Sequence, residues 1–118
     1  MKSILKSIRT AAAAAAALAA STLAVAQPSG EPVIFGVGAP LTGRSAAFGT
    51  QVRYGAEVAA KEINAKGGLL GRPFQVEIKD DASTANEAAI VAQSFAGDPK
   101  VAAVVGHFNS DCSSAAKS

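Results

Sequence analysis

The sequence has few of the side chains that bind metals, form disulfides or fill a large core. Its 118 residues include one cysteine, one histidine, one tyrosine and no tryptophan. A single cysteine cannot form a disulfide within the chain, and with a single histidine it cannot supply the ligands of a zinc site. We therefore expect no metal and no cofactor, and expect Cys112 to be a small buried hydrophobe or an exposed thiol that pairs between chains.

The first residues have the three parts of a secretory signal peptide. Three basic residues come first: Lys2, Lys6 and Arg9. An uncharged, mostly Ala and Leu run follows from Thr10 to Val25, and Ala24-Val25-Ala26 matches a cleavage motif. A membrane anchor is the alternative, but alanine is a poor substitute for leucine in a spanning helix. We predict that residues 1–26 are removed, leaving no membrane anchor and, without a cysteine at the cleavage site, no lipid anchor.

Removal of this segment changes the charge of the protein. Three of the eleven basic residues lie in it, so residues 27–118 carry eight basic against nine acidic side chains. Without a net positive charge or a basic patch, nucleic acid is not expected as a partner. The remaining 92 residues suffice for one small domain, but so few aromatic side chains predict a marginal core.

The spacing of apolar residues predicts alternating strands and helices. Thr84 and Glu87 form a capping box at the start of one helix, and Gly67 with Gly68 stops another. In chain order we expect a strand at 33–38, a helix from 48 to 66, a strand at 74–79, a helix between 84 and 97, and a strand at 101–105.

This order predicts an α/β fold with a doubly wound parallel sheet, here an incomplete lobe spanning 27–118. Right-handed crossovers place the helices on the faces of the sheet, with strand order 2-1-3 and the alternating second strand at an edge. Ligands of such sheets bind beyond the carboxyl ends of the strands, where the strand order reverses. Three segments reach that edge: 39–48, 80–84 and 107–114.

The first of these segments nearly matches a phosphate-binding loop. Gly38 to Ser45 has the glycine spacing of such a loop, but Arg44 replaces the lysine and Pro40 removes a backbone donor. An exported phosphate- or nucleotide-binding module is therefore an alternative function. A sharp turn from strand to helix explains the glycines and Pro40 more simply.

A hydrolase is not expected from the polar residues at this edge. The serines at 110, 113 and 114 have only His107 as a base, without a G-x-S-x-G turn. His107 is more simply a structural residue that forms hydrogen bonds near the strand end. Asp80 and Asp81 point to opposite sides of an extended chain, and we expect them to end the strand and favour the positive end of the next helix.

Ser110 has two interpretations, between which the local sequence does not choose. It follows a strand and precedes a helix, where its hydroxyl and free backbone N–H groups could hold a ligand carboxylate. The alternative is a plain N-cap.

Longer motifs resemble a known family. The tract from Gly55 to Gly68, then Gly71-Arg72-Pro73, Asp80-Asp81 and finally Val104 to Ser110 resemble the amino-terminal lobe of type I periplasmic binding proteins for branched-chain amino acids, of the leucine-binding-protein type. The resemblance implies a periplasmic receptor rather than an enzyme. In such a receptor two α/β lobes close on an amino-acid ligand and deliver it to the membrane components of an ABC importer.

The resemblance also assigns residues. Ser110 would offer its hydroxyl and N–H to the ligand carboxylate, while Phe108 and Phe48 would line the pocket. Asp111 stands where relatives usually have a small residue, and its charge would repel an anionic ligand. Some members have a disulfide between two loops, but Ser83 and Asn109 occupy those positions, so Cys112 is expected to be unpaired.

The resemblance covers only the first part of such a receptor. The second lobe, with its ligand groups, would be missing, so we expect a truncated fragment that alone shows no measurable binding. With three strands the sheet would expose an apolar edge where a fourth strand should pair, which invites aggregation. A small interaction protein that uses this edge is a further alternative function.

Overall fold

The computed structural model describes residues 26–117, so the predicted signal peptide at 1–26 lies outside the described residues except for Ala26. The described elements are β1 (Val33–Ala39), α2 (Ala46–Ala65), β2 (Phe74–Asp80), α3 (Ala85–Ala96), β3 (Val101–Val105) and α4 (Ser110–Ala115). The predicted alternation of strands and helices is confirmed. Helix α2 begins before the expected Phe48 because the alanines at 46 and 47 are good helix formers.

The three strands form one parallel sheet in the order β2-β1-β3, as predicted. Val33 lies beside Phe74, and the pairing of β1 with β2 continues to Ala39 beside Asp80. This pairing extends both strands one residue beyond the ranges expected from sequence. Strand β2 lies at an edge of the sheet, which agrees with its alternating pattern.

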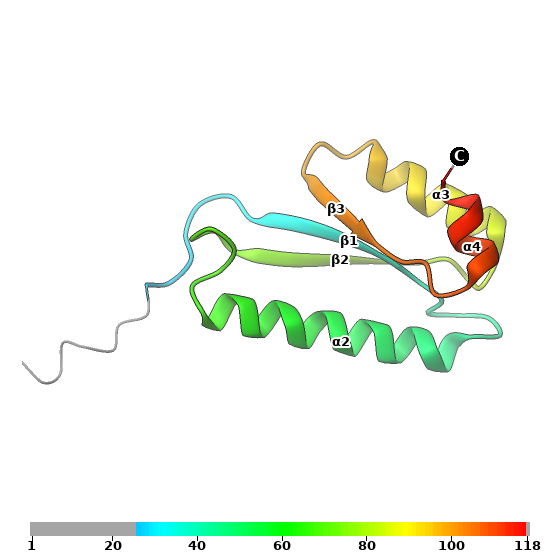
Figure 1. Ribbon diagram of the computed structural model, residues 1–118, viewed down its shortest axis with the longest axis horizontal. Helices are drawn as coiled ribbons and strands as arrows, with labels where there is room; N and C mark the ends of the chain where they lie inside the picture. The colour runs from blue at the N-terminus through cyan, green and yellow to red at the C-terminus, as the bar shows by residue number, and fades with distance from the viewer. Residues whose placement is uncertain (1–25, 118) are drawn as a thin grey trace, which may run out of the picture.

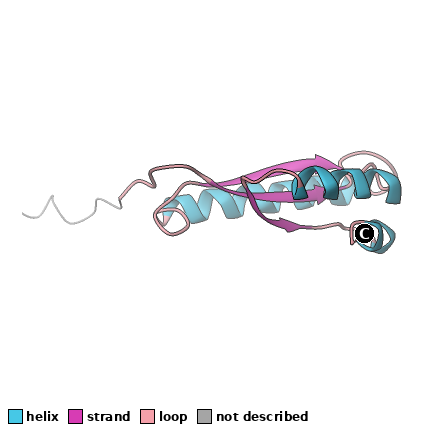
Figure 2. Cartoon of the chain, turned by 90° about the horizontal axis from the view of Figure 1, so that it is seen from above, coloured by secondary structure: helices cyan, strands magenta, loops and turns pink. Residues whose placement is uncertain are grey.

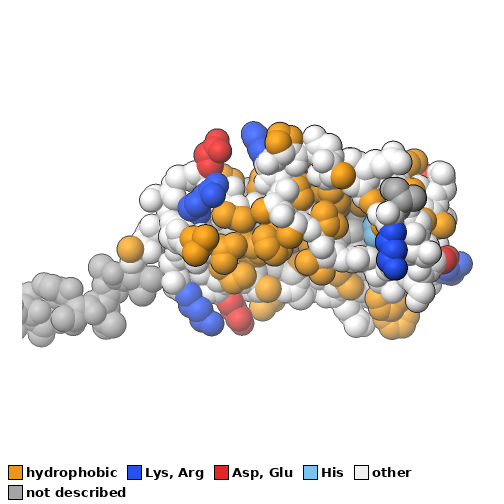
Figure 3. Space-filling model, turned by 45° about the horizontal axis from the view of Figure 1, so that its top comes forward, with side chains coloured by type: hydrophobic (Ala, Val, Ile, Leu, Met, Phe, Trp, Pro, Cys, Tyr) orange, Lys and Arg blue, Asp and Glu red, His pale blue; other side chains and the backbone are white. Residues whose placement is uncertain are grey.

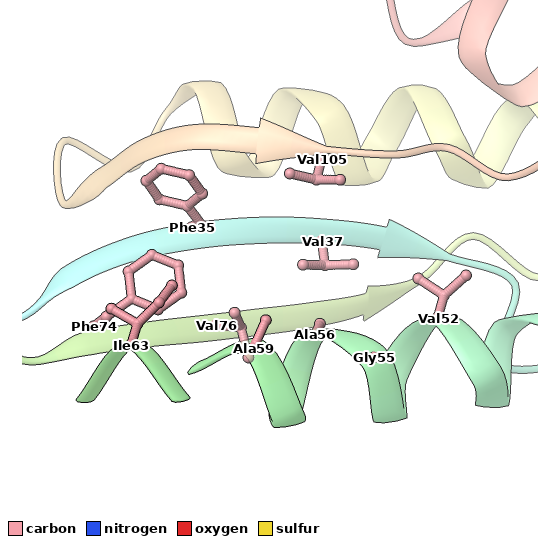
Figure 4. Close-up of a pocket in the computed structure, with 10 residues that line it drawn as sticks. All are labelled: Phe35, Val37, Val52, Gly55, Ala56, Ala59, Ile63, Phe74, Val76 and Val105. Carbon is pink, nitrogen blue, oxygen red and sulfur yellow. The ribbon is translucent and has the colours of Figure 1, made fainter. Parts of the chain in front are cut away.

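The two faces of β1 contact different helices. Phe35 and Val37 face α2 (Figure 4), whereas Gly36 faces α3, where a Cβ on it would lie 2.8 Å from the ring of Phe95. Figure 1 accordingly shows α2 along one side of the sheet and α3 with α4 along the other. The strands point toward the end of the molecule where α4 lies (Figures 1 and 2).

The α3 side of the sheet is packed more tightly than the α2 side. Ala88, Val91 and Phe95 of α3 are buried, whereas Gly49 is the one buried residue of α2. The remaining buried apolar residues are Val37, Ala39, Pro40, Phe74 and Cys112. Among residues 26–117, no helix is both long and apolar enough to cross a membrane.

Candidate ligand-binding site at the carboxyl edge of the sheet

Three loops meet at the carboxyl ends of the strands, where the parallel sheet directs them. They join β1 to α2 (40–45), β2 to α3 (81–84) and β3 to α4 (106–109). Residues of the first loop bond to residues of the other two, far away in sequence. The edge where the sequence predicted a site is therefore a connected polar structure.

Thr42 and Asp80 join the first loop to the end of β2. The Thr42 hydroxyl donates to Asp80 Oδ2 over 2.5 Å, and the Thr42 N–H donates to Oδ1 over 3.1 Å. Oδ1 also accepts from the Ala82 N–H over 2.8 Å. Partial burial would raise the pKa of Asp80, but these hydrogen bonds to its charged form hold the pKa below its ordinary value.

Ser45 connects all three loops. Its backbone N–H donates to Ser83 Oγ over 3.1 Å, and its hydroxyl donates to Asn109 Oδ1 over 3.1 Å. Ser83 Oγ in turn donates to the Thr42 carbonyl over 3.2 Å. Ser83 and Asn109, the positions where some family members have a disulfide, thus both bond to Ser45. The sequence reasoning did not single out Ser45.

A buried pair of Asp81 and His107 lies beneath these loops. His107 Nδ1 is 2.7 Å from Asp81 Oδ2, and their side chains are 2% and 0% exposed. An ionised carboxylate only accepts hydrogen bonds, so Nδ1 donates in this pair. The other oxygen of Asp81 accepts from the Ser83 N–H over 2.9 Å.

The imidazole packs against the backbone of β1 as well. A Cβ on Gly38 would lie 2.5 Å from the ring, so only glycine fits there. The His107 carbonyl accepts from the Ser113 hydroxyl over 2.9 Å. His107 therefore has the structural role that the sequence suggested, whereas its pairing with Asp81, 26 residues away, was not foreseen.

Phe48 and Phe108 contact each other at the outer side of this edge. Their rings stack with centroids 4.9 Å apart and planes 14° apart. The side chains come from α2 and from the loop after β3, and they remain 51% and 48% exposed. Two of the three predicted site residues thus form one exposed aromatic surface.

Ser110, the third predicted site residue, is the first residue of α4 and is exposed. The N-cap is Asn109, which has extended backbone angles, so the interpretation of Ser110 as a plain N-cap is wrong. The Ser113 N–H donates to the Asn109 carbonyl over 2.9 Å. The first N–H groups of a helix have no acceptor within it, and the Ser110 N–H is one of them.

Asp111 is paired with Arg44. The guanidinium Nη2 lies 3.1 Å from Asp111 Oδ2, and both side chains are more than half exposed. Asp111 Oδ1 accepts from the Cys112 N–H over 3.0 Å. This backbone bond, followed by the contact with Arg44, holds the pKa of Asp111 below its ordinary value. The positive charge of Arg44 therefore partly compensates the repulsion that Asp111 was expected to exert on a ligand carboxylate.

The phosphate-loop alternative is not supported by this geometry. A phosphate-binding loop needs free backbone N–H groups, but those of Thr42 and Ser45 donate to Asp80 and Ser83, and that of Leu41 to the Ala39 carbonyl. The carboxylate of Asp80 at the loop would also repel phosphate. Glycine serves the turn here, as the positive φ of 81° at Gly43 shows.

Cys112 is buried and unpaired, as expected from its being the single cysteine. Burial raises the pKa of its thiol, and the charges of Asp81 and Asp111 raise it further. The thiol therefore stays protonated and packs as an apolar group. Within the described residues, no cluster of His, Cys, Asp and Glu is suited to hold a metal ion.

The sequence model of the periplasmic binding protein family matches residues 32–118. This chain belongs to the periplasmic binding protein family. Among curated relatives, the Leu/Ile/Val-binding protein homolog 2 of Brucella abortus is 48% identical over 81 residues, covering 69% of this chain and 22% of that protein. An amino acid binding protein of Pseudomonas aeruginosa is 44% identical, covering 70% of this chain and 21% of that protein.

Solved structures show the same fold. The isoleucine complex of LivJ, a branched-chain amino acid transporter substrate-binding protein from Streptococcus pneumoniae, has a TM-score of 0.69 and 38% identity, covering 73% of this chain and 25% of that one. A leucine complex of a substrate-binding protein from Desulfitobacterium hafniense has a TM-score of 0.65 and 34% identity. The match covers 73% of this chain and 24% of that one. The predicted fold and family are confirmed, and the chain spans about a quarter or less of these proteins.

Proposed function

We propose that this chain forms the part of a periplasmic amino-acid receptor that holds the ligand carboxylate. The observation that carries the proposal is the convergence of Ser110, Phe108 and Phe48 at one edge of the sheet. The hydroxyl and N–H of Ser110 are donors for a carboxylate, and the stacked rings offer an apolar wall. The chemistry fits a small amino acid with an apolar side chain, and it needs no catalytic group.

Relatives support the choice of ligand and partner. Of the solved structures similar to this chain, one is a branched-chain amino acid transporter substrate-binding protein with isoleucine, and another is an ABC transporter substrate-binding protein with leucine. We propose a branched-chain or related amino acid as the ligand, an ABC importer as the partner, and the periplasm as the location. Export would depend on residues 1–26. Mass spectrometry of the periplasmic form tests this, and a mature protein that begins at Gln27 is expected.

A chimera provides the binding test. Residues 32–117 replace the matching segment of the Brucella abortus Leu/Ile/Val-binding protein homolog 2, and leucine, isoleucine and valine binding is measured by isothermal titration. Ser110→Ala should weaken binding roughly 10- to 100-fold, because it removes a hydrogen bond to a charged group. The control is Ser114→Ala, an exposed serine on the same helix, which should leave the affinity unchanged.

Two outcomes would contradict the proposal. Equal affinities of the Ser110→Ala and unsubstituted chimeras would remove Ser110 from the site. Micromolar binding by the 118-residue chain alone would contradict its being only one part of the site.

A further inference from the structure

An ion pair adjoins the residue that is proposed to hold the ligand carboxylate. Asp111 follows Ser110 in α4, and its Oδ2 lies 3.1 Å from Nη2 of Arg44, in the loop after β1. A hydrogen bond from the Cys112 N–H, and then the contact with Arg44, hold the pKa of Asp111 below its ordinary value, so this side chain is ionised at neutral pH. Its charge acts on any anion that binds at the neighbouring Ser110.

The loop that carries Arg44 is anchored on both sides of this residue. Thr42 donates to Asp80 with both its N–H and its hydroxyl. The Ser45 N–H donates to Ser83 Oγ over 3.1 Å. These hydrogen bonds hold the backbone from which the Arg44 side chain extends, so the ion pair joins α4 to a loop of defined position.

A second contact joins the same two segments. Phe48, four residues after Arg44, stacks on Phe108, three residues before Asp111, with ring centroids 4.9 Å apart. Ser110 lies between Phe108 and Asp111 in the chain. The proposed carboxylate donor is therefore flanked by residues of an apolar contact and of an ionic contact, and both contacts reach to the segment 44–48.

The charges at this edge balance through Arg44. It is the one lysine or arginine in the three loops at 40–45, 81–84 and 106–109, all of which the structure describes. Asp80 and Asp81 have both oxygens occupied by hydrogen bonds from the loops. Asp111 is different, because its charge is 53% exposed and its charged partner is Arg44, 67% exposed. Figure 3 likewise shows hydrophobic side chains across the middle of one face and charged ones toward its margins, including the α4 end.

We propose that Arg44 sets the affinity of this site for the ligand carboxylate by neutralising Asp111. The inference rests on the proposed function, in which Ser110 holds that carboxylate. The charge balance of the pair acts on the ligand, and the contact between the two side chains does not. Asp111 without Arg44 repels the carboxylate, whereas Arg44 without Asp111 attracts it. The two residues therefore have opposite effects on affinity, although they form one ion pair.

The test uses the chimera that carries residues 32–117, with isothermal titration of leucine, isoleucine and valine at low salt. Arg44→Gln should weaken binding about 3- to 5-fold, and Asp111→Asn should strengthen it by about the same factor, which is the upper range for an exposed charge interaction. The double variant Arg44→Gln/Asp111→Asn should bind within about twofold of the unsubstituted chimera. Arg44→Lys should do so too, because it keeps the charge.

Lys61→Gln is the matched control, since it removes the same charge from an exposed residue at the far end of α2. Lys61 lies three residues before Asn64, whose side chain bonds to the backbone of Phe74 at the opposite end of the sheet. This substitution should leave the affinity unchanged. Salt is a second measurement: raising NaCl from about 20 mM to about 500 mM should reduce the effects of Arg44→Gln and Asp111→Asn, because salt screens exposed charges.

Weaker binding by both single variants would overturn the proposal, because it would show that the contact positions α4 and that the charge balance does not matter. Unchanged affinity of Arg44→Gln, or effects that persist at high salt, would overturn it as well. A double variant as weak as Arg44→Gln would mean that Arg44 touches the ligand itself, which also contradicts the proposal.

Failure of the proposed function gives a different result. Ser110→Ala would then bind as tightly as the unsubstituted chimera, whatever the Arg44 variants do. If Ser110→Ala weakens binding while Arg44→Gln does not, the proposed function stands and the role of Arg44 is wrong. A folded chimera that binds none of the three amino acids would contradict both.

Discussion

The loops at the carboxyl ends of the strands and the free edge of β3 both lie at the surface, but their contacts are of opposite kinds. In the loops, the polar side chains of Asp81 and Ser45 are buried and hydrogen-bonded, with Asp81 0% and Ser45 9% exposed. Along β3, apolar side chains are exposed, with Val105 at 56%. Substitutions in the loops should therefore affect folding and the position of α4, whereas substitutions of the exposed side chains of β3 should affect the stability of the described residues less. The predictions below test that separation.

The largest effect is expected for Asp81→Ala. It leaves His107 Nδ1 and the Ser83 N–H buried without their acceptor. Each unsatisfied buried donor costs about 1–3 kcal/mol, so the two together cost about 2–6 kcal/mol. This is a large fraction of the stability of an ordinary domain. Denaturant unfolding of the purified protein at neutral pH measures the change.

Asp98→Ala is the matched control. The Asp98 side chain accepts one exposed hydrogen bond, from the Lys100 N–H over 2.9 Å, and its loss should cost about 1 kcal/mol or less. If the two substitutions destabilise the protein equally, the buried pair contributes no more to stability than an exposed hydrogen bond does.

The sequence predicted the fold because the fold depends on local patterns. Alternation in β2, the capping box at Thr84 and the paired glycines after α2 are each readable within a few residues. Thr84 Oγ1 does accept from the Glu87 N–H, over 3.3 Å. Strand order followed from the handedness of crossovers, which is a general property of parallel sheets.

The contacts of the site were less accessible to sequence reasoning. Asp81 and His107 are 26 residues apart, and Ser45 and Asn109 are 64 apart. Nothing in either local sequence shows which polar groups meet once the strands are paired. The sequence placed Ser110 at the carboxyl edge of the sheet, where the structure has it. It did not show that Asn109 is the N-cap and Ser110 the first helical residue, because backbone angles decide this difference of one residue.

Ser45→Ala should have an intermediate effect. The Ser45 N–H still bonds to Ser83, but Asn109 Oδ1 loses its donor, and an unsatisfied, partly buried acceptor costs about 1–3 kcal/mol. Hydrogen exchange in α4 should become faster, because Asn109 caps that helix. The control is Ser94→Ala, which removes a hydroxyl of α3 that bonds to the Val91 carbonyl and the Lys79 ammonium. It should leave hydrogen exchange in α4 unchanged. Unchanged exchange in α4 on Ser45→Ala would show that this bond does not position the helix.

The smallest effect is expected for Thr42→Val, and it should depend on pH. The pKa of Asp80 lies below its ordinary value of 3.8 in the folded protein. The bonds to its charged form therefore stabilise the fold at pH above the unfolded pKa, and this contribution is lost as pH falls through the folded pKa. Thr42→Val removes the hydroxyl donor and should raise the pKa of Asp80 toward its ordinary value.

The free energy of unfolding of Thr42→Val should be lower than that of the unsubstituted protein by about 0.5–1 kcal/mol at neutral pH, a modest value because the pair is exposed to solvent. The difference should shrink as pH falls through the lowered pKa of Asp80 in the folded protein, because below it Asp80 is protonated in both proteins. Urea unfolding across this pH range measures it. A difference that stays constant with pH would mean that Thr42 acts through packing of its methyl group rather than through Asp80. In that case the polar contacts between the first loop and β2 would add little to stability.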